Sequence, residues 1–281
     1  MKYRKMGLLD WDVSALGFGC MRLPPSGLRQ NVDEKSAIEI IREGIDLGIN
    51  YLDTAWPYHE GFSEVILGKA LKDGYRKKIR VATKLPTFLV KTENDFDRFL
   101  NSQLERLDID CIDVYLFHCL TKLEFEKIKR LNLIDKMEKA KAEGKIRHIG
   151  FSFHDTFPVL KEIVDYYNWD IGQIQYNYLD TDIQATTNGL KYLHEKAIAV
   201  VIMEPLKGGL LVNPPKEVRN ILQNAKPLRT PVDWALQFLW NQPEVSVVLS
   251  GMSSRRQVVE NCPSADRSGV NSLIQNDPVM F

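Results

Sequence analysis

The stretch INYLDTAWPYHEGFSEVILGKALKDG, residues 49–74, joins a short apolar strand pattern to a longer helix pattern. The same strand-then-helix order recurs along the chain, and eight such units can be counted. This alternation predicts a parallel sheet, and eight units favour a closed barrel over an open, doubly wound sheet. The first strand pattern is not followed by GxGxxG, the usual signature of the open dinucleotide-binding sheet. We therefore predict an α/β fold of the (β/α)₈ TIM-barrel type.

Short local signals set the boundaries of these units. Thr92 can cap the helix pattern TENDFDRFLNSQLERLD, and Gly144 can end the pattern NLIDKMEKAKAEG. No linker divides the chain, so residues 1–281 are expected to form a single domain. The last helix pattern is SRRQVVENC, and residues 262–281 are expected to form an extended tail because they lack a strong helical stripe. The expected strands are SALGFGC, INYLDTA, IRVATK, IDVYLFH, KIRHIGFS, IGQIQYN, IAVVIMEPL and VSVVLSG.

Composition excludes several classes of function. The 37 basic and 37 acidic residues balance, so there is no electrostatic reason to expect nucleic acid or an anionic membrane as a partner. The N-terminal stretch lacks the apolar core of a signal peptide, and no window approaches the length of a transmembrane helix. The four cysteines are scattered, without a CxxC pair or metal-ligand spacing. We predict a cytoplasmic protein without a bound metal.

Four polar residues lie at or just after the ends of three successive strand patterns: Asp53, Tyr58, Lys84 and His118. Taken alone, each has a structural explanation. Asp53 could form an Asx turn, and Lys84 could be a solvated loop residue. His118 and Tyr58 could be packed side chains. In barrel enzymes, however, the chemistry collects at the carboxyl ends of the strands, so the joint placement of the four residues favours a catalytic site.

In the contexts YLDTAWPYHEG, VATKLP and DVYLFHC, these residues resemble the catalytic tetrad of the aldo-keto reductase superfamily. The resemblance covers nearly the whole chain, as far as GMSSRRQVVEN. The stretch YRKMGLLDWDVSALGFGCMRLP looks like the N-terminal β-hairpin and first strand of that family. The resemblance implies a TIM barrel with an N-terminal β-hairpin that reduces a small aldehyde or ketone to an alcohol, and it suggests a monomer.

The resemblance also implies a role for each residue of the tetrad. Hydride delivery to a carbonyl carbon creates an alkoxide that must gain a proton, and Tyr58 is the expected general acid. The unperturbed pKa of tyrosine is about 10, and the neighbouring ammonium of Lys84 is expected to lower it. Asp53 would keep this lysine charged and oriented. His118 would hydrogen-bond the carbonyl oxygen or assist the proton transfer.

A nicotinamide dinucleotide is the implied cofactor, with its carboxamide held by Ser152 in GFSFHD and by Gln175 in QIQYN. The chain departs from the family where Phe153 replaces a usual asparagine. It departs again where Met203 replaces the aromatic ring that many members stack on the nicotinamide, although a thioether can also cover a ring face. Further contacts are expected after the first strand, from the tetrad aspartate and from a loop over the pyrophosphate. They are Gly19, Cys20, Met21, Asp53, Pro205, Leu206 and Gly208.

The terminal motif bears on the choice between NADP and NAD. Many members of the family carry Lys and Arg where this chain has Gly251 and Gln257, which removes two usual phosphate ligands. Ser253, Ser254 and Arg255 or Arg256, near a helix N-terminus, could still bind a 2′-phosphate. We therefore expect NADPH, the alternative being that both arginines are merely solvated. The residues expected at the adenosine end are Leu249, Gly251, Ser253, Arg255, Gln257, Glu260 and Asn261.

The sequence indicates the class of substrate but not a particular compound. Trp56, Phe88, Phe151 and Phe153 are the expected apolar walls of the substrate pocket, although any of them could belong to the core. Such a pocket suits aldehydes or ketones of modest size.

Two other functions stay open. One is a cofactor-sensing regulatory module like the potassium-channel β-subunits, which share the fold and the terminal motif but tend to lack the histidine found here at His118. The other is a barrel with unrelated chemistry and an accidental match to the tetrad. The variants GFSFHD and MEPLKGGLL also resemble a subgroup that often continues into a cysteine-rich iron–sulfur domain, and this sequence contains no such cysteines.

Overall fold

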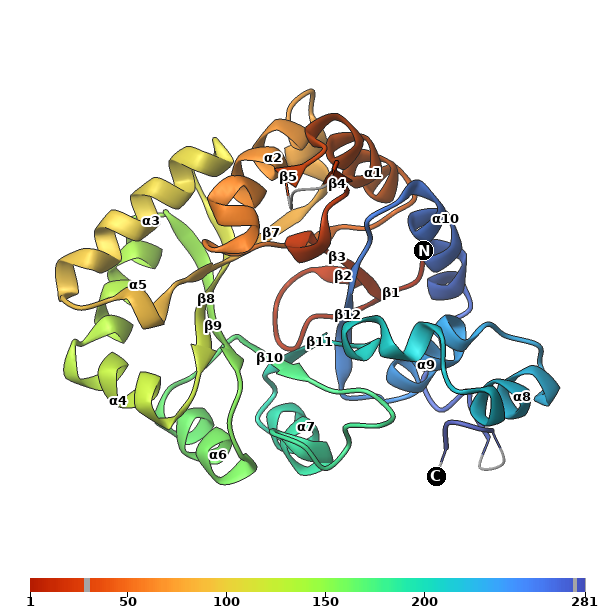
Figure 1. Cartoon of the computed structure of the whole chain (residues 1–281). Helices are drawn as coiled ribbons and strands as arrows, with labels where there is room; N and C mark the ends of the chain where they lie inside the picture. Colours follow the sequence, from red (N-terminus) through yellow and green to blue (C-terminus); the bar gives the residue numbers. More distant parts are fainter. Residues whose placement is uncertain (28–30, 275–276, 281) are drawn as a thin grey trace.

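Eight parallel strands close into a barrel in the computed structural model, which describes residues 1–27, 31–274 and 277–280. Around the barrel the strands follow the order β10-β11-β12-β3-β6-β7-β8-β9, and the helices form a ring outside them (Figure 1). The predicted (β/α)₈ barrel is therefore confirmed. The barrel strands are β3 (Leu16–Gly19), β6 (Tyr51–Asp53), β7 (Arg80–Leu85), β8 (Ile112–Leu120), β9 (Ile146–Phe153), β10 (Ile171–Gln175), β11 (Ala199–Met203) and β12 (Val245–Gly251).

The outer helices begin and end at the signals that the sequence carries. Thr92 and Asp95 form a capping box at the start of α3, whose apolar stripe is buried. Within the described ranges, none of the helices has the length and apolar character that crossing a membrane requires. The helices are α1 (Glu34–Asp46), α2 (Phe62–Ala70), α3 (Glu93–Leu107), α4 (Lys122–Arg130), α5 (Leu133–Ala142), α6 (Phe157–Tyr166), α7 (Thr186–Glu195), α8 (Lys216–Asn224), α9 (Pro231–Trp240) and α10 (Arg255–Asp266).

Three helical segments differ from the prediction. No helix was predicted from the sequence at the positions of α4 and α8. Helix α10 continues to Asp266, so the first residues of the expected tail, 262–281, are helical. Cys262 and Ala265 extend its buried face, which explains the longer helix. Residues 275–276 and 281 of that tail lie outside the described residues.

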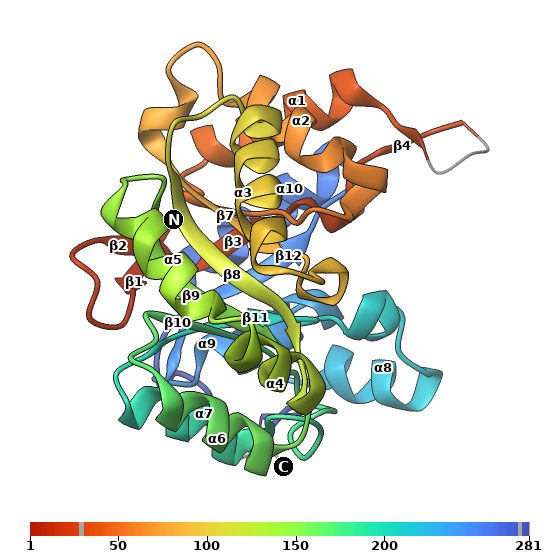
Figure 2. The ribbon, with the colours of Figure 1, turned by 90° about the vertical axis from the view of Figure 1, so that its left-hand side faces the viewer.

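An antiparallel hairpin closes the amino end of the barrel. Strands β1 (Tyr3–Lys5) and β2 (Asp12–Ser14) pair with each other, which confirms the expected N-terminal β-hairpin. Met6 and Val13 are fully buried and belong to the apolar cluster inside the barrel. Figure 2 shows the hairpin at one end of the barrel, with α8 at the other. The functional residues are thus expected at the end that the hairpin leaves open.

The inside of the barrel changes from apolar to polar toward its carboxyl end. Side chains two positions apart on a strand share a face. Tyr51, Ala82 and Leu116 lie in the apolar cluster inside the barrel. Two positions further along the same strands come Asp53, Lys84 and His118, which are 3%, 1% and 7% exposed. Three members of the predicted tetrad therefore lie at the carboxyl end of the barrel.

Candidate active site at the carboxyl end of the barrel

A buried ion pair forms the base of the site. The Nζ atom of Lys84 donates to Oδ1 of Asp53 at 2.6 Å and to the backbone oxygen of Thr54 at 2.8 Å. Burial raises the pKa of the Asp53 carboxyl, and the charge of Lys84 opposes this effect. Burial acts to lower the pKa of Lys84, but Asp53 and Tyr58 together leave that pKa above its ordinary value. The lysine therefore stays charged at neutral pH.

Tyr58 lies beside this pair, in the loop between β6 and α2. Its ring centre is 5.0 Å from Nζ of Lys84 and 6.0 Å from the ring centre of His118, and the two rings are nearly perpendicular. Burial raises the pKa of the Tyr58 phenol, while the positive charge of Lys84 opposes the rise. The effect of Lys84 on this pKa thus has the direction that the sequence predicts. Here burial outweighs the lysine, so the phenol is protonated at neutral pH.

His118 completes the tetrad as a neutral imidazole. Burial, with smaller contributions from Lys84 and His154, lowers the pKa of His118 to about 3. Its Nδ1 atom is buried and has no hydrogen-bond partner among the described residues. The ring of Phe88 lies 5.8 Å from the imidazole. A neutral imidazole with a free nitrogen can hydrogen-bond a ligand oxygen without bringing a charge into the barrel.

The structure separates the four expected pocket walls into two groups. Phe88 is 44% exposed next to His118, and Trp56 is partly buried in the loop that carries Tyr58. Phe151 and Phe153, in contrast, are fully buried in the core outside the barrel, and Phe151 packs on Trp169. Because strand side chains alternate, Ser152 points inward where its two neighbours point outward. Phe151 is therefore a core residue and not a pocket wall.

The side-chain amide of Gln173, a residue that the sequence analysis did not single out, has an oxygen without a partner among the described residues, whereas the amide of Gln175 is fully engaged. Gln175 donates Nε2 to Asp180 at 3.0 Å and accepts from Gln184 at 3.2 Å. Gln173 pairs in register with Ser152, and its buried Oε1 atom has no partner among the described residues. The sequence signal was the alternation in QIQ, which places both glutamines on the same face.

The same corner of the barrel fits the carboxamide of a nicotinamide. The Nε2 atom of Gln173 lies 3.8 Å from the sulfur of Met203, which places the thioether beside the free amide. The hydroxyl oxygen of Ser152 accepts from the backbone N–H of Cys119 at 2.8 Å, which leaves its own O–H free to donate. An amide ligand could therefore donate to Gln173 and accept from Ser152.

Glycines lie at the carboxyl ends of β3 and β12 and in the loop after β11. Gly19 and Gly251 are partners in register, and Gly208 has a φ of +65°. The aliphatic part of Arg22 packs on Gly251, and its Nη2 atom lies 3.8 Å from where a Cβ at Gly208 would be. Arg22, which the sequence analysis did not single out, makes no ion pair with the described residues, so its guanidinium could bind an anion. Of the other expected contacts, Cys20, Pro205 and Leu249 are buried, Leu206 is partly buried, and Met21 is 53% exposed.

Most polar side chains of the terminal motif already bind other groups of the protein. Arg255 binds both carboxylate oxygens of Glu43, at 2.9 and 2.8 Å. Arg256 pairs with Glu260 one turn along α10, at 2.7 Å. Gln257 accepts from the backbone N–H of Ser253 at 2.7 Å, and the buried Asn261 donates to Ser250 at 3.3 Å.

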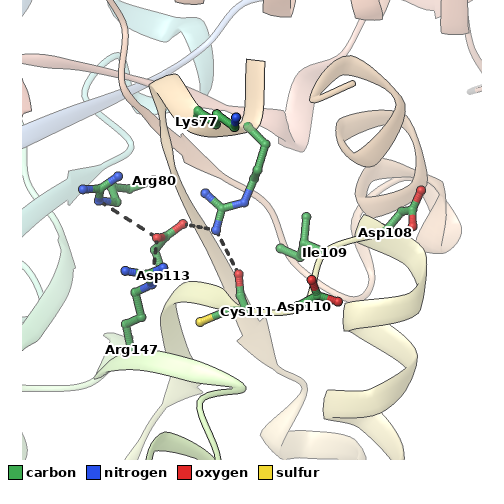
Figure 3. Close-up of a pocket in the computed structure, with 9 residues that line it drawn as sticks. Lys77, Arg80, Asp108, Ile109, Asp110, Cys111, Asp113 and Arg147 are labelled. Carbon is green, nitrogen blue, oxygen red and sulfur yellow. Dashed lines mark hydrogen bonds and ion pairs between the residues drawn. The ribbon is translucent and has the colours of Figure 1, made fainter. Parts of the chain in front are cut away.

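A hollow of about 500 Å³ lies far from these residues, at the amino ends of β7 and β8 (Figure 3). Its centre is the buried carboxylate of Asp113, which contacts Arg76 at 2.7 Å and Arg147 at 3.5 Å. Arg80 lies 4.0 Å from the same carboxylate. A second hollow, of about 510 Å³, lies beside α6 and also contains no tetrad residue. The hollows therefore do not mark the candidate active site.

Comparison with known proteins identifies a single family. The model of the Aldo/keto reductase family matches residues 15–268. An uncharacterized oxidoreductase of Bacillus subtilis is 30% identical and covers 95% of this chain and 92% of its own. An NADH-specific methylglyoxal reductase of Escherichia coli is 32% identical, over 75% of this chain and 69% of its own. The structure of an aldo-keto reductase from Bacillus halodurans in its holo form has a TM-score of 0.83 at 30% identity, and the match covers 99% of this chain and 94% of that one.

Proposed function

Because this chain belongs to the aldo/keto reductase family of oxidoreductases, we propose that it is a cytoplasmic, NADPH-dependent reductase that converts aldehydes or ketones to alcohols. The observation that carries the proposal is the buried Lys84–Asp53 pair with Tyr58 and His118 beside it. These side chains are the groups needed to protonate an alkoxide as it forms.

Each tetrad residue has a distinct task in this mechanism. The reduced nicotinamide, when bound, supplies the hydride. The phenol of Tyr58 is protonated at neutral pH, because burial raises its pKa, and donates its proton to the substrate oxygen. The charge of Lys84, held by Asp53, stabilises the phenolate that remains. His118 donates a hydrogen bond to the same substrate oxygen as a neutral group, and in the oxidation direction Tyr58 acts as the base.

We assign the carboxamide of the cofactor to Ser152 and Gln173, and its ring face to Met203. The support is the unpartnered oxygen of Gln173, its register with Ser152 and its contact with the methionine sulfur. A thioether packs on a ring face through its polarizable sulfur. Arg22 is proposed to bind the pyrophosphate, because its guanidinium has no counter-ion within the described part of the chain.

The proposed preference for NADPH over NADH rests on Arg255. Its two contacts with Glu43 use two of the five N–H donors of the guanidinium, which leaves three for a 2′-phosphate. The side chain is 77% exposed and therefore open to a ligand. The apolar side chains near His118, Phe88 above all, support a substrate with a small apolar body next to its carbonyl.

The test is a titration of the purified protein with NADPH and NADH, followed by tryptophan fluorescence. The same samples then receive a panel of aromatic and aliphatic aldehydes while the absorbance of the reduced cofactor is recorded. We expect tighter binding of NADPH and aldehyde-dependent oxidation that Tyr58→Phe abolishes without weakening cofactor binding. If Tyr58→Phe kept near-normal turnover, the proposed mechanism would be wrong. Tight binding without turnover by the wild type would instead favour a cofactor-sensing module.

A further inference from the structure

The loop that carries Tyr58 has an unusual backbone. The three residues that follow the tyrosine, His59, Glu60 and Gly61, have φ values of +51°, +57° and +93°. Left-handed conformations are costly for residues other than glycine, and they persist only where the surroundings hold them. One stabilising contact is a hydrogen bond in which the Nε2 atom of His59 accepts from the backbone N–H of Leu23 at 3.2 Å.

Arg106, on the neighbouring helix α3, makes a second and larger set of contacts that stabilise this loop. Its guanidinium carbon lies 3.6 Å from the ring centre of Trp56, two residues before Tyr58. Its Nη1 atom lies 3.5 Å from the backbone oxygen of Trp56 and 3.1 Å from where a Cβ at Gly61 would be. The guanidinium therefore touches the loop on both sides of Tyr58. A Cβ at position 61 would be in unusually tight contact with the guanidinium, which would have to shift by a few tenths of an ångström.

Arg106 is in turn anchored by a buried carboxylate. Its Nη1 atom lies 3.3 Å from Oε2 of Glu64, whose side chain is fully buried. The other oxygen of Glu64 accepts from Thr83 at 2.7 Å and from Gln103 at 2.6 Å. Gln103 also donates to the backbone oxygen of Lys84 at 3.1 Å. A single buried network thus contacts both the loop of the proposed acid and the strand of its lysine.

We infer that Arg106, anchored by Glu64, is a positioning residue that fixes the hydroxyl of Tyr58 relative to Lys84 and His118. It is not among the proposed substrate or cofactor contacts, and it acts through Trp56 and Gly61. The inference rests on the proposed function, because it concerns the reach of the proposed general acid. The inference gives a role to the Arg106–Glu64 pair, which has no other part in the proposed mechanism.

The experiment compares Arg106→Met with Arg98→Met. Arg98 is a matched control, because it lies on the same helix, stacks 4.3 Å from the ring of Phe99 and is paired with Asp95. We expect Arg106→Met to lower kcat for aldehyde reduction by roughly 10- to 100-fold, the penalty typical of a displaced reacting group. The Kd for NADPH should stay within about twofold, because no cofactor contact is lost. Arg106→Lys keeps the charge and should recover part of the rate, and Arg98→Met should change neither quantity.

Two additions keep the outcome decisive. Arg106→Met leaves Glu64 buried without its cation, so Arg106→Met/Glu64→Gln removes the whole pair and should show the same loss of kcat with a Tm nearer to that of the wild type than Arg106→Met has. Tyr58→3-fluorotyrosine gives a ¹⁹F signal that needs no turnover. Without Arg106 this signal should broaden or shift toward the value of an exposed tyrosine. The inference is overturned if a folded variant without Arg106 keeps both the wild-type kcat and the wild-type ¹⁹F signal. A wild type that shows no turnover would count against the proposed function alone, and the ¹⁹F signal would still decide the role of Arg106.

Discussion

Replacing Lys84 by methionine would test the electrostatic basis of the proposed mechanism. The substitution keeps most of the side-chain volume but removes a charge that lies 5.0 Å from the ring centre of Tyr58. At an effective dielectric constant of about 20, two unit charges at that separation interact by about 3 kcal/mol. The phenolate of Tyr58 would lose this stabilisation. Alcohol oxidation, in which the phenolate is the base, should therefore slow by about two orders of magnitude at neutral pH.

The assay is the rate of NADP-dependent oxidation of an alcohol product between pH 6 and pH 9. Because burial keeps the pKa of the Tyr58 phenol above its ordinary value even with Lys84 present, the rates of both proteins should rise with pH over this range, and that of Lys84→Met should stay about two orders of magnitude below the wild type throughout. The variant also leaves Asp53 buried without its cation, at a cost of about 3 kcal/mol in the free energy of unfolding. The double variant Lys84→Met/Asp53→Asn removes this cost and should be as slow as the single one. A rate within threefold of the wild type at pH 7 would refute the reasoning.

Three further outcomes are expected. Because His118 has a pKa of about 3 in the folded protein and 6.5 as an ordinary histidine, the unfolded chain binds its proton first as the pH falls. The free energy of unfolding of the wild type should therefore fall as the pH drops from 6.5 to 5. In urea titrations this fall should be smaller in His118→Gln, by roughly 1.5 kcal/mol. An unchanged pH dependence would contradict this account. Asp113→Asn should lower the free energy of unfolding by about 3 kcal/mol, because three guanidinium groups lose their shared counter-ion, whereas the exposed Arg147→Met should cost less than about 1 kcal/mol. Arg255→Met should raise the Kd for NADPH about tenfold and leave that for NADH unchanged, and an equal effect of Arg256→Met would argue against a specific phosphate contact.

The fold could be predicted from the sequence because its main signal is local. Each strand-then-helix unit shows its own periodicity, so the eight-fold count needed no knowledge of distant contacts. The placement of the predicted tetrad at one end of the barrel could be foreseen for the same reason, since Asp53, Lys84 and His118 lie at or near the carboxyl ends of strands that are neighbours in the barrel. The error at Phe151 has a physical cause. A one-residue difference in register decides whether a strand residue faces the barrel interior or the helices, and hydrophobicity is the same on both sides of a barrel strand.

The residues that escaped prediction act through tertiary contacts. Gln173 and Gln175 differ only in their partners, because Asp180 and Gln184 engage one glutamine and leave the other free. Arg106 has an ordinary place on an amphipathic helix, and only its position above Trp56 points to a function. The net pKa of Tyr58 also depends on the balance between burial and the charge of Lys84, which spacing in the sequence does not measure.

Three of the buried atoms without partners gather at the carboxyl end of the barrel, whereas the two hollows lie elsewhere. In the hollow at the amino end, the carboxylate of Asp113 already has guanidinium groups and a backbone N–H as partners. At the carboxyl end, Asp53 Oδ2, His118 Nδ1 and Gln173 Oε1 are buried without partners among the described residues. Leaving such atoms unpaired costs free energy, and a bound ligand or water can complete their hydrogen bonds. The three atoms come from β6, β8 and β10 at the carboxyl end, where the chemistry of barrel enzymes collects, and this placement supports the proposed site.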